Sequence, residues 1–282
     1  MDKSKIKSLA IGHFDGIHLG HKALFSHCLD GGVLVIENDG LKLTPKRESF
    51  INLPIFYKNI NDIKALSPKE FIKLLKNEFV NLKKIVVGYD FKFGKNRSAD
   101  AIFLKNIFDG EVVIVNEKKI NNISVHSEKI REFLKKANIK MANLLLDRVY
   151  EIKGNLIKGQ GLGKKELFST LNLDASNYFL PKNGVYATFT NLNNKDFKSV
   201  TFIGNRLSTD DKFSVETHII EPFSEDKING KITIKFKDFI RDNKKFENLN
   251  ELKFQISKDI LKAQDILKKD ELWKMKFSNN QF

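Results

Sequence analysis

The chain has 282 residues, 41% of them hydrophobic and 30% charged, with only 5 prolines, which excludes a collagen and a long disordered tail. At about 100–200 residues per domain, this length predicts two domains. The net charge of +14 would suit a polyanionic partner, but the lysines are spread in pairs along the chain, which favours a solvated surface over a nucleic-acid groove.

Short apolar runs alternate with helical patterns in the first half of the chain. We expect strands at Leu9–Ile11, Val33–Ile36, Ile55–Tyr57, Ile85–Val87 and Val112–Val115, and helices at Leu19–Cys28, Pro68–Phe79 and Ala101–Phe108. Ser67 before Pro68, with Glu70 following, is a helix start signal. The alternation predicts an α/β domain whose parallel sheet is covered on both faces and binds ligands beyond the carboxyl ends of its strands.

The second half has a different pattern, in which turn signals separate strand-like stretches. We expect strands at Tyr150–Ile157, Val185–Thr190, Val200–Ile203, Val215–Ile220 and Lys231–Phe236, followed by one long helix at about Leu249–Lys268. This pattern predicts a small antiparallel β-barrel domain with a C-terminal helix. The period of the hydrophobic pattern changes near residues 140–150. We therefore predict two domains, 1–145 and 146–282.

The single cysteine, Cys28, cannot form an internal disulfide, and its place in a helical pattern predicts a small buried side chain. No apolar run approaches the roughly 18 residues of a membrane span. We therefore expect a cytoplasmic protein that binds small molecules, neither nucleic acid nor membrane, and is a monomer or a weak homo-oligomer.

The strongest local signal is the run GHFDGIHLGH at residues 12–21, directly after the first strand and at the start of the first helix. Glycines let the backbone approach a ligand, and a helix N-terminus offers free N–H groups to phosphate. His18 and His21 lie three residues apart, on one side of the first turn, where both can hydrogen-bond charge that develops on a phosphoryl group. The alternative is a surface turn with two solvated histidines.

This run resembles the HxGH nucleotidyltransferase superfamily, in the version GxFDGxHxGH of prokaryotic FAD synthetases, which pair an FMN adenylyltransferase with a riboflavin kinase. Leu66–Phe71 is similar to the LSPEEF helix start of that family, and Val87–Gly94 with Arg97 is similar to its VGxDFrFGxxR loop. The resemblance covers roughly residues 8–265. It implies that the first domain is a Rossmann-like HxGH nucleotidyltransferase domain.

In that family, the FMN phosphate attacks the α-phosphorus of ATP in line, which gives FAD and pyrophosphate. The resemblance implies that His18 and His21 are catalytic, and that the nucleotide and flavin are bound by residues of three segments: Gly12, Phe14 and Asp15; Asp90, Phe93 and Arg97; Ser127 and Arg131. Core packing is the alternative for Phe93. Glu128 replaces a threonine of the triphosphate segment, and a carboxylate there repels ATP unless it points away.

The run Gly159–Asn172 is too divergent for a Walker loop, but it resembles the riboflavin kinase signature GxxxGRxLGFPTAN. The resemblance implies that Gly163 and Lys164 contact the nucleotide, and that Thr170 and Asn172 hold its Mg²⁺. Polar residues at the end of a strand are the alternative.

Ser214–Ile219 resembles the kinase strand sVExHil, which implies that Glu216 is the base that takes the proton of the riboflavin 5′-hydroxyl. Strand alternation puts Glu216 and His218 on the face opposite Val215 and Thr217. Arg241 stands where the family has an arginine before the last helix, and a contact with the flavin is one of two open interpretations of it.

Together, the resemblances of the two halves predict an enzyme of FAD biosynthesis. It phosphorylates riboflavin to FMN with ATP and then adenylylates FMN to FAD. An adenylyltransferase with a degenerate kinase module is the alternative.

Overall fold

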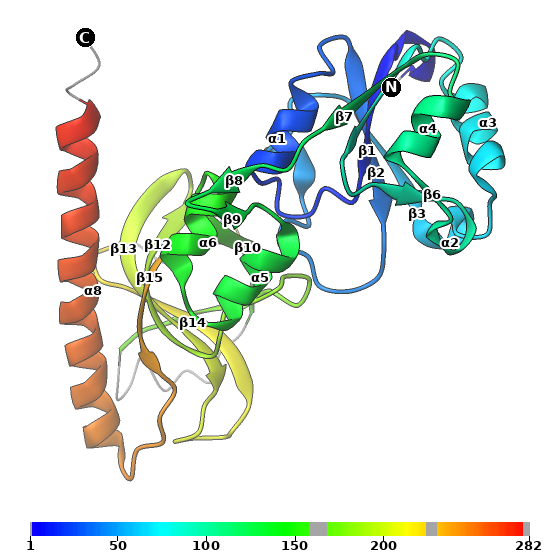
Figure 1. The fold of residues 1–282 in the computed structure, drawn as a ribbon. Coiled ribbons are helices and arrows are strands. Elements are labelled where there is room, and N and C mark those ends of the chain that lie inside the picture. The colour runs from blue at the N-terminus through cyan, green and yellow to red at the C-terminus, as the bar shows by residue number, and fades with distance from the viewer. Residues whose placement is uncertain (1, 158–167, 224–229, 279–282) are drawn as a thin grey trace. The chain divides into compact units, whose positions relative to one another are not determined.

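The computed structural model describes residues 2–157, 168–223 and 230–278, with the side chains of the last helix described through residue 269. Contacts divide the chain into two compact units, Met1–Lys129 and Ile130–Phe282, and each unit is described by itself. Figure 1 gives the order of the elements along the chain.

The first unit is built on a parallel sheet of five strands in the order β3-β2-β1-β4-β7. The strands are β1 (Ser8–Gly12), β2 (Gly31–Glu37), β3 (Ile55–Asn59), β4 (Lys84–Gly88) and β7 (Glu111–Val115). All five predicted strands are therefore confirmed. The strand order reverses between β1 and β4, and ligands of such sheets bind beyond the carboxyl ends of the strands at this switch point.

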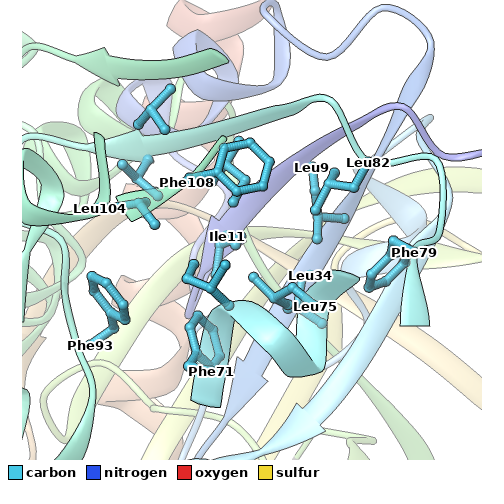
Figure 2. Packing of buried hydrophobic residues seen from close by; sticks show 14 of the residues in the cluster. Leu9, Ile11, Leu34, Phe71, Leu75, Phe79, Leu82, Phe93, Leu104 and Phe108 are labelled. Carbon is cyan, nitrogen blue, oxygen red and sulfur yellow. The ribbon is translucent and has the colours of Figure 1, made fainter. Parts of the chain in front are cut away.

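Helices cover both faces of this sheet, as the continuous apolar strands require. Leu9 and Ile11 of β1 pack with α3 (Pro68–Glu78) and α4 (Ala101–Ile107) in the cluster drawn in Figure 2. Ala10, between them, packs on the opposite face with α1 (Leu19–Phe25) and the buried Cys28. The Rossmann-like α/β fold of this unit and the buried place of Cys28 are as expected.

The helix ends follow local hydrogen bonding. Ser67 and Glu70 form the predicted capping box: the Ser67 hydroxyl accepts from the Glu70 N–H at 3.3 Å, and the Glu70 carboxylate accepts from the Ser67 N–H at 2.7 Å. Helix α1 ends before the predicted Cys28, because the N–H groups of His27 and Cys28 bond three residues back and tighten the last turn. Several short elements were not predicted: α2 (Ile60–Ile63) and the ribbons β5 (Lys92–Phe93) with β6 (Ala99–Asp100) and β8 (Lys119–Ile120) with β9 (Ile123–Ser124).

The second unit contains a closed antiparallel barrel with the strand order β10-β11-β14-β13-β12-β15. Its strands are β10 (Tyr150–Ile157), β11 (Leu171–Asp174), β12 (Gly184–Leu192), β13 (Lys195–Asn205), β14 (Phe213–Ile219) and β15 (Lys231–Asp242). Five of them coincide with predicted strands. The sixth strand, β11, was not predicted, because its four residues alternate between apolar and polar over too short a stretch to establish a strand pattern.

One side of the barrel interior is polar. Its five fully buried hydroxyls are those of Thr188, Thr190, Ser199, Thr201 and Thr217. Neighbouring hydroxyl oxygens lie 2.8–3.0 Å apart and close a ring, in the order 188, 199, 190, 217, 201 and back to 188. Each hydroxyl can donate one bond and accept one within the ring, so these polar groups are satisfied without water.

The long helix α8 (Leu249–Ser278) packs against the outside of β12, β13 and β15, and extends ten residues beyond the predicted end (Figure 1). Ala263 and Leu267 of α8 contact Val185 and Ala187 of the barrel. The antiparallel barrel with a C-terminal helix is therefore confirmed. Within the described residues, none of the helices is both long and apolar enough to span a membrane.

Two unpredicted helices, α5 (Ser127–Lys135) and α6 (Ile139–Leu146), lie near the junction of the units. Helix α6 belongs to the barrel unit, because Asn143 accepts a hydrogen bond from the Tyr150 N–H at 2.7 Å and donates one to the Phe236 carbonyl at 3.0 Å. Along the chain, the boundary between the compact units lies between residues 129 and 130. The division into catalytic domains at residues 145 and 146 stays a prediction.

The core of the first unit leads to a stability prediction. Leu75 is fully buried in the cluster of Figure 2, whereas Leu29 is 88% exposed. We expect Leu75→Ala to lower the free energy of unfolding by about 3 kcal/mol, because a buried cavity adds to the lost transfer free energy. Leu29→Ala should cost less than about 0.5 kcal/mol. Urea unfolding followed by circular dichroism measures both, and equal losses would contradict this core assignment.

Candidate functional site

The turn after β1 has an unusual backbone. Phe14 and Ile17 both have φ near 45°, and Gly16 between them has φ of 88°. Left-handed values at a phenylalanine and a β-branched isoleucine are strained, and such strain persists only where surrounding contacts impose it.

Contacts from distant segments impose this conformation. Both Asp15 carboxylate oxygens accept backbone N–H bonds, from Leu43 and Thr44, at 3.0 Å each. The buried Arg47 donates from Nε to the Phe14 carbonyl at 2.9 Å, and Ser127 donates from its hydroxyl to the Asp15 carbonyl at 2.6 Å. Asp15 and Ser127, predicted to contact the nucleotide, therefore hold the turn together.

The two motif histidines lie side by side beyond this turn. His18 is the N-cap of α1, where its Nδ1 accepts the His21 N–H at 3.3 Å, and the two rings stack with centroids 3.5 Å apart. The Phe14 ring meets the His21 ring edge-on at 5.2 Å. A Cβ at Gly20 would lie 3.1 Å from the His18 ring, which explains the glycine between the histidines.

Burial keeps both histidines neutral. Desolvation, assisted by the charge of His126, lowers the pKa of His18 to about 3. Desolvation, followed by electrostatic repulsion between the protonated ring and its neighbours His18 and Arg47, lowers the pKa of His21 well below its usual value. Since His18 Nδ1 accepts a hydrogen bond, its proton resides on Nε2. Among the described residues, His21 Nδ1 is buried and has no hydrogen-bond partner. The pair therefore offers ring N–H groups in a fixed arrangement.

A second polar group lies at the carboxyl ends of β4 and β7, beside the switch point. The Tyr89 hydroxyl and His126 Nε2 lie 3.0 Å apart, and the Ser124 hydroxyl donates to Glu117 at 2.5 Å. Tyr89 is the first residue after β4, and its N–H bonds to the Val115 carbonyl at the end of β7. No sequence motif predicted this group, although its position after two parallel strands is a usable signal.

The other predicted residues of the first site differ in exposure. Gly12 ends β1, and Asp90 and Arg97 are exposed on the loop after β4. Phe93 is only 6% exposed and packs against Phe71 with ring centroids 5.6 Å apart. Its position therefore matches the alternative of core packing.

Two other residues of the triphosphate segment have different surroundings. Glu128 is exposed in the first turn of α5, where a carboxylate complements the helix dipole. Arg131 belongs to the second unit, where its guanidinium lies 5.5 Å from the Phe179 ring.

The barrel gathers the predicted kinase residues on one face. Asn172 of β11 pairs directly with Glu216 of β14, so their side chains project from the same face. The Thr170 hydroxyl lies 3.5 Å from Glu216 Oε2. His218 follows Glu216 on this face, and its Nδ1 donates to the Ser169 carbonyl at 2.8 Å, which holds the segment before β11. The predicted alternation along β14 is confirmed, since Val215 and Thr217 are buried.

The oxygens on this face suit a hard cation. Thr170 supplies a hydroxyl and Asn172 an amide oxygen, next to the Glu216 carboxylate, and oxygen ligands are what Mg²⁺ prefers. The described residues contain no cluster of three or more His, Cys, Asp or Glu side chains that could hold a metal ion. A Mg²⁺ ion would therefore depend on hydroxyl and amide oxygens and on substrate phosphates.

Two arginines of the barrel unit have ionic partners. Arg206, which sequence analysis missed, donates from Nη1 to Glu216 Oε1 at 3.1 Å. Arg241 donates from Nε and Nη2 to the buried Asp259 of α8 at 2.8–3.0 Å. Arg241 thus joins the barrel to α8, and its predicted flavin contact stays a prediction. Gly163 and Lys164 lie outside the described residues.

Known proteins share both halves of this architecture. A riboflavin kinase family model matches residues 146–267, and an FAD synthetase family model matches residues 42–129. The bifunctional riboflavin kinase/FMN adenylyltransferase of Buchnera aphidicola subsp. Acyrthosiphon pisum is 33% identical, with 91% of this chain and 92% of the relative covered. The protein of the same name from Bacillus subtilis is 28% identical, with 89% of each chain covered.

A solved structure supports the fold. The crystal structure described as a macrolide-efflux protein from Streptococcus pneumoniae has a TM-score of 0.79 to this chain, covers 92% of it with 94% of its own length, and is 24% identical. This likeness concerns the fold alone. Identity of 33% over nearly the whole length, together with both family models in the expected order, shows that the chain belongs to the family of bifunctional riboflavin kinase/FMN adenylyltransferases.

Proposed function

We propose that the two halves of this chain catalyse successive reactions of FAD biosynthesis: residues 146–282 phosphorylate riboflavin, and residues 1–145 adenylylate the FMN that results. The convergence of Thr170, Asn172 and Glu216 on one barrel face supports the kinase assignment. The stacked pair His18 and His21, presented by the turn after β1, supports the adenylyltransferase assignment.

In the adenylyltransferase half, an oxygen of the FMN phosphate attacks the α-phosphorus of ATP, and pyrophosphate leaves. No covalent enzyme intermediate is needed, so positioning and charge stabilisation supply the catalysis. The neutral His18 and His21 donate hydrogen bonds to the phosphate oxygens on which charge develops. The exposed Asp90 and Arg97 contact the nucleotide or flavin from the loop after β4.

In the kinase half, Glu216 takes the proton of the riboflavin 5′-hydroxyl as that oxygen attacks the γ-phosphorus of ATP, and ADP leaves. Thr170 and Asn172 would hold Mg²⁺, whose charge neutralises the nucleotide phosphates when it is bound. His218 keeps Thr170 beside Glu216 through its bond to Ser169. A degenerate kinase module is not favoured, since these residues persist and the kinase family model matches residues 146–267.

The remaining expectations follow from the substrates. We place the enzyme in the cytoplasm, because it consumes ATP and its one cysteine needs no oxidising compartment. Its partners are then riboflavin, FMN and ATP, without nucleic acid or membrane, and the protein acts as a monomer or a weak homo-oligomer.

The first test replaces a motif histidine. We expect His21→Ala to slow FAD formation from FMN by roughly 10²–10⁴-fold, because the variant removes a donor to the developing charge. FMN formation from riboflavin should persist. Chromatographic separation of flavins after incubation with Mg-ATP measures both reactions. His27→Ala, at an exposed histidine just beyond α1, is the matched control, and equal losses in the two variants would refute the role of His21.

The second test removes the proposed base. Glu216→Gln keeps the shape of the side chain, and we expect it to slow riboflavin phosphorylation by roughly 10²–10⁴-fold because the amide cannot accept the proton. FAD formation from supplied FMN should be unchanged. Glu247→Gln, at an exposed position before α8, is the control. Full kinase activity of the folded Glu216 variant would rule out the assignment.

The neutral histidines also predict a pH dependence of stability. Unfolded histidines bind protons near pH 6.5, whereas folded His18 does so only near pH 3, so the unfolded state gains protons first as the pH falls. Stability is retained above pH 6.5 and declines below it, with His18 contributing about 2 kcal/mol of the loss on reaching pH 5 and His21 adding to it in the same direction. Urea unfolding across this range should show a shallower decline for His21→Gln than for His27→Gln. Identical slopes in the two variants would contradict the buried neutral state.

A further inference from the structure

An arginine in the turn between β13 and β14 contacts two carboxylates at once. Arg206 directly follows β13, and its side chain is only 17% exposed. Its Nε and Nη2 donate to the two oxygens of Asp210 at 2.9 Å each, and its Nη1 donates to Glu216 Oε1 at 3.1 Å. One edge of the guanidinium therefore binds the turn, and the remaining nitrogen reaches the proposed base.

The turn that presents this guanidinium is closed by its own hydrogen bonds. The Arg206 N–H donates to the Lys212 carbonyl at 3.0 Å, and the Arg206 carbonyl accepts from the Thr209 N–H at 2.9 Å. The Lys212 N–H also donates to Asp210 at 3.2 Å. Because the backbone and the carboxylate of Asp210 are both fixed, the free edge of Arg206 has little freedom to move away from Glu216.

The two oxygens of Glu216 have different surroundings. Oε1 accepts the charge-assisted bond from Arg206, while Oε2 faces the Thr170 hydroxyl at 3.5 Å, on the side of the proposed nucleotide site. A carboxylate held through one oxygen cannot rotate without breaking that bond. Arg206 thus determines which oxygen of Glu216 remains available to a substrate.

We propose that Arg206 is a positioning residue of the kinase reaction, which holds Glu216 through Oε1 so that Oε2 receives the proton of the 5′-hydroxyl. The inference depends on the proposed role of Glu216. In the step itself, the O–H proton moves to Oε2, the substrate oxygen forms its bond to the γ-phosphorus, and the bond from that phosphorus to ADP breaks. Arg206 exchanges no atom. The competing explanation is that Arg206 only stabilises the turn through Asp210.

Matched variants separate these explanations. Arg206→Gln removes both contacts, whereas Asp210→Asn weakens only the one to the turn. We expect Arg206→Gln to lower kcat for riboflavin phosphorylation by about 10- to 100-fold, with KM for riboflavin within about threefold and FAD formation from FMN unchanged. Asp210→Asn should keep kcat within about threefold. Added guanidinium at millimolar concentration should restore part of kcat to Arg206→Ala, because the free cation can occupy the same place.

Several outcomes would overturn the inference. Equal losses of kcat and of melting temperature in Arg206→Gln and Asp210→Asn would assign Arg206 to the turn alone. Additive losses in the double variant Arg206→Gln/Glu216→Gln would show that Arg206 does not act through Glu216, since coupled residues are non-additive. An active Arg206→Gln beside an inactive Glu216→Gln would refute this inference only. A fully active Glu216→Gln would refute the proposed base, and the inference with it.

Discussion

The first site depends on a turn whose backbone opposes the preferences of its own residues. The left-handed conformations of Phe14 and Ile17 cost on the order of 1–3 kcal/mol each. Asp15, through the N–H groups of Leu43 and Thr44, offsets this cost, and so does Arg47 through the Phe14 carbonyl. Because α1 begins directly beyond the turn, these contacts also determine where the stacked histidines lie. Segments far apart in the sequence are thereby required for the geometry of one short motif.

The two sites use different electrostatic means. Burial keeps the imidazoles of His18 and His21 uncharged, so in the proposed mechanism they are fixed dipoles that need no reorganisation when phosphate charge develops. The barrel face instead pairs the carboxylate of Glu216 with the guanidinium of Arg206, at positions that remain partly open to solvent. Neutral dipoles suit the proposed adenylyl transfer, because the attacking phosphate oxygen has no proton to lose. A carboxylate suits the proposed phosphorylation of riboflavin, because the attacking hydroxyl must lose its proton.

Patterns of period 2 and 3.6 were enough to predict the parallel sheet, the barrel and the helices α3, α4 and α8. They could not reveal β11, whose four residues are too few to establish a period. They also could not reveal α5 and α6, two short helices at and directly after the boundary between the units. The motifs located the histidines and Glu216. The contacts of Arg47 and Tyr89 were not predictable, because each joins segments whose proximity arises only on folding. Arg206 contacts residues only four and ten positions away, but the pattern of the sequence does not give the direction of its side chain in the turn. Asp15 and Phe93 belong to the predicted binding motifs, but both side chains point inward. Asp15 accepts hydrogen bonds from Leu43 and Thr44, and Phe93 packs against Phe71, so each contacts a segment distant in the sequence.

The closed ring of hydroxyls inside the barrel restricts how the sequence can change over evolution. Replacing one member, such as Thr188, by valine opens the ring and leaves a donor at one end of the chain of hydroxyls and an acceptor at the other, both without water. Exchanging two neighbours together, such as Thr190 and Thr217, leaves a shorter chain of three hydroxyls that is also open at both ends. Partial replacement therefore opens the ring whichever members are lost, and we expect the five hydroxyls to be retained together among homologues.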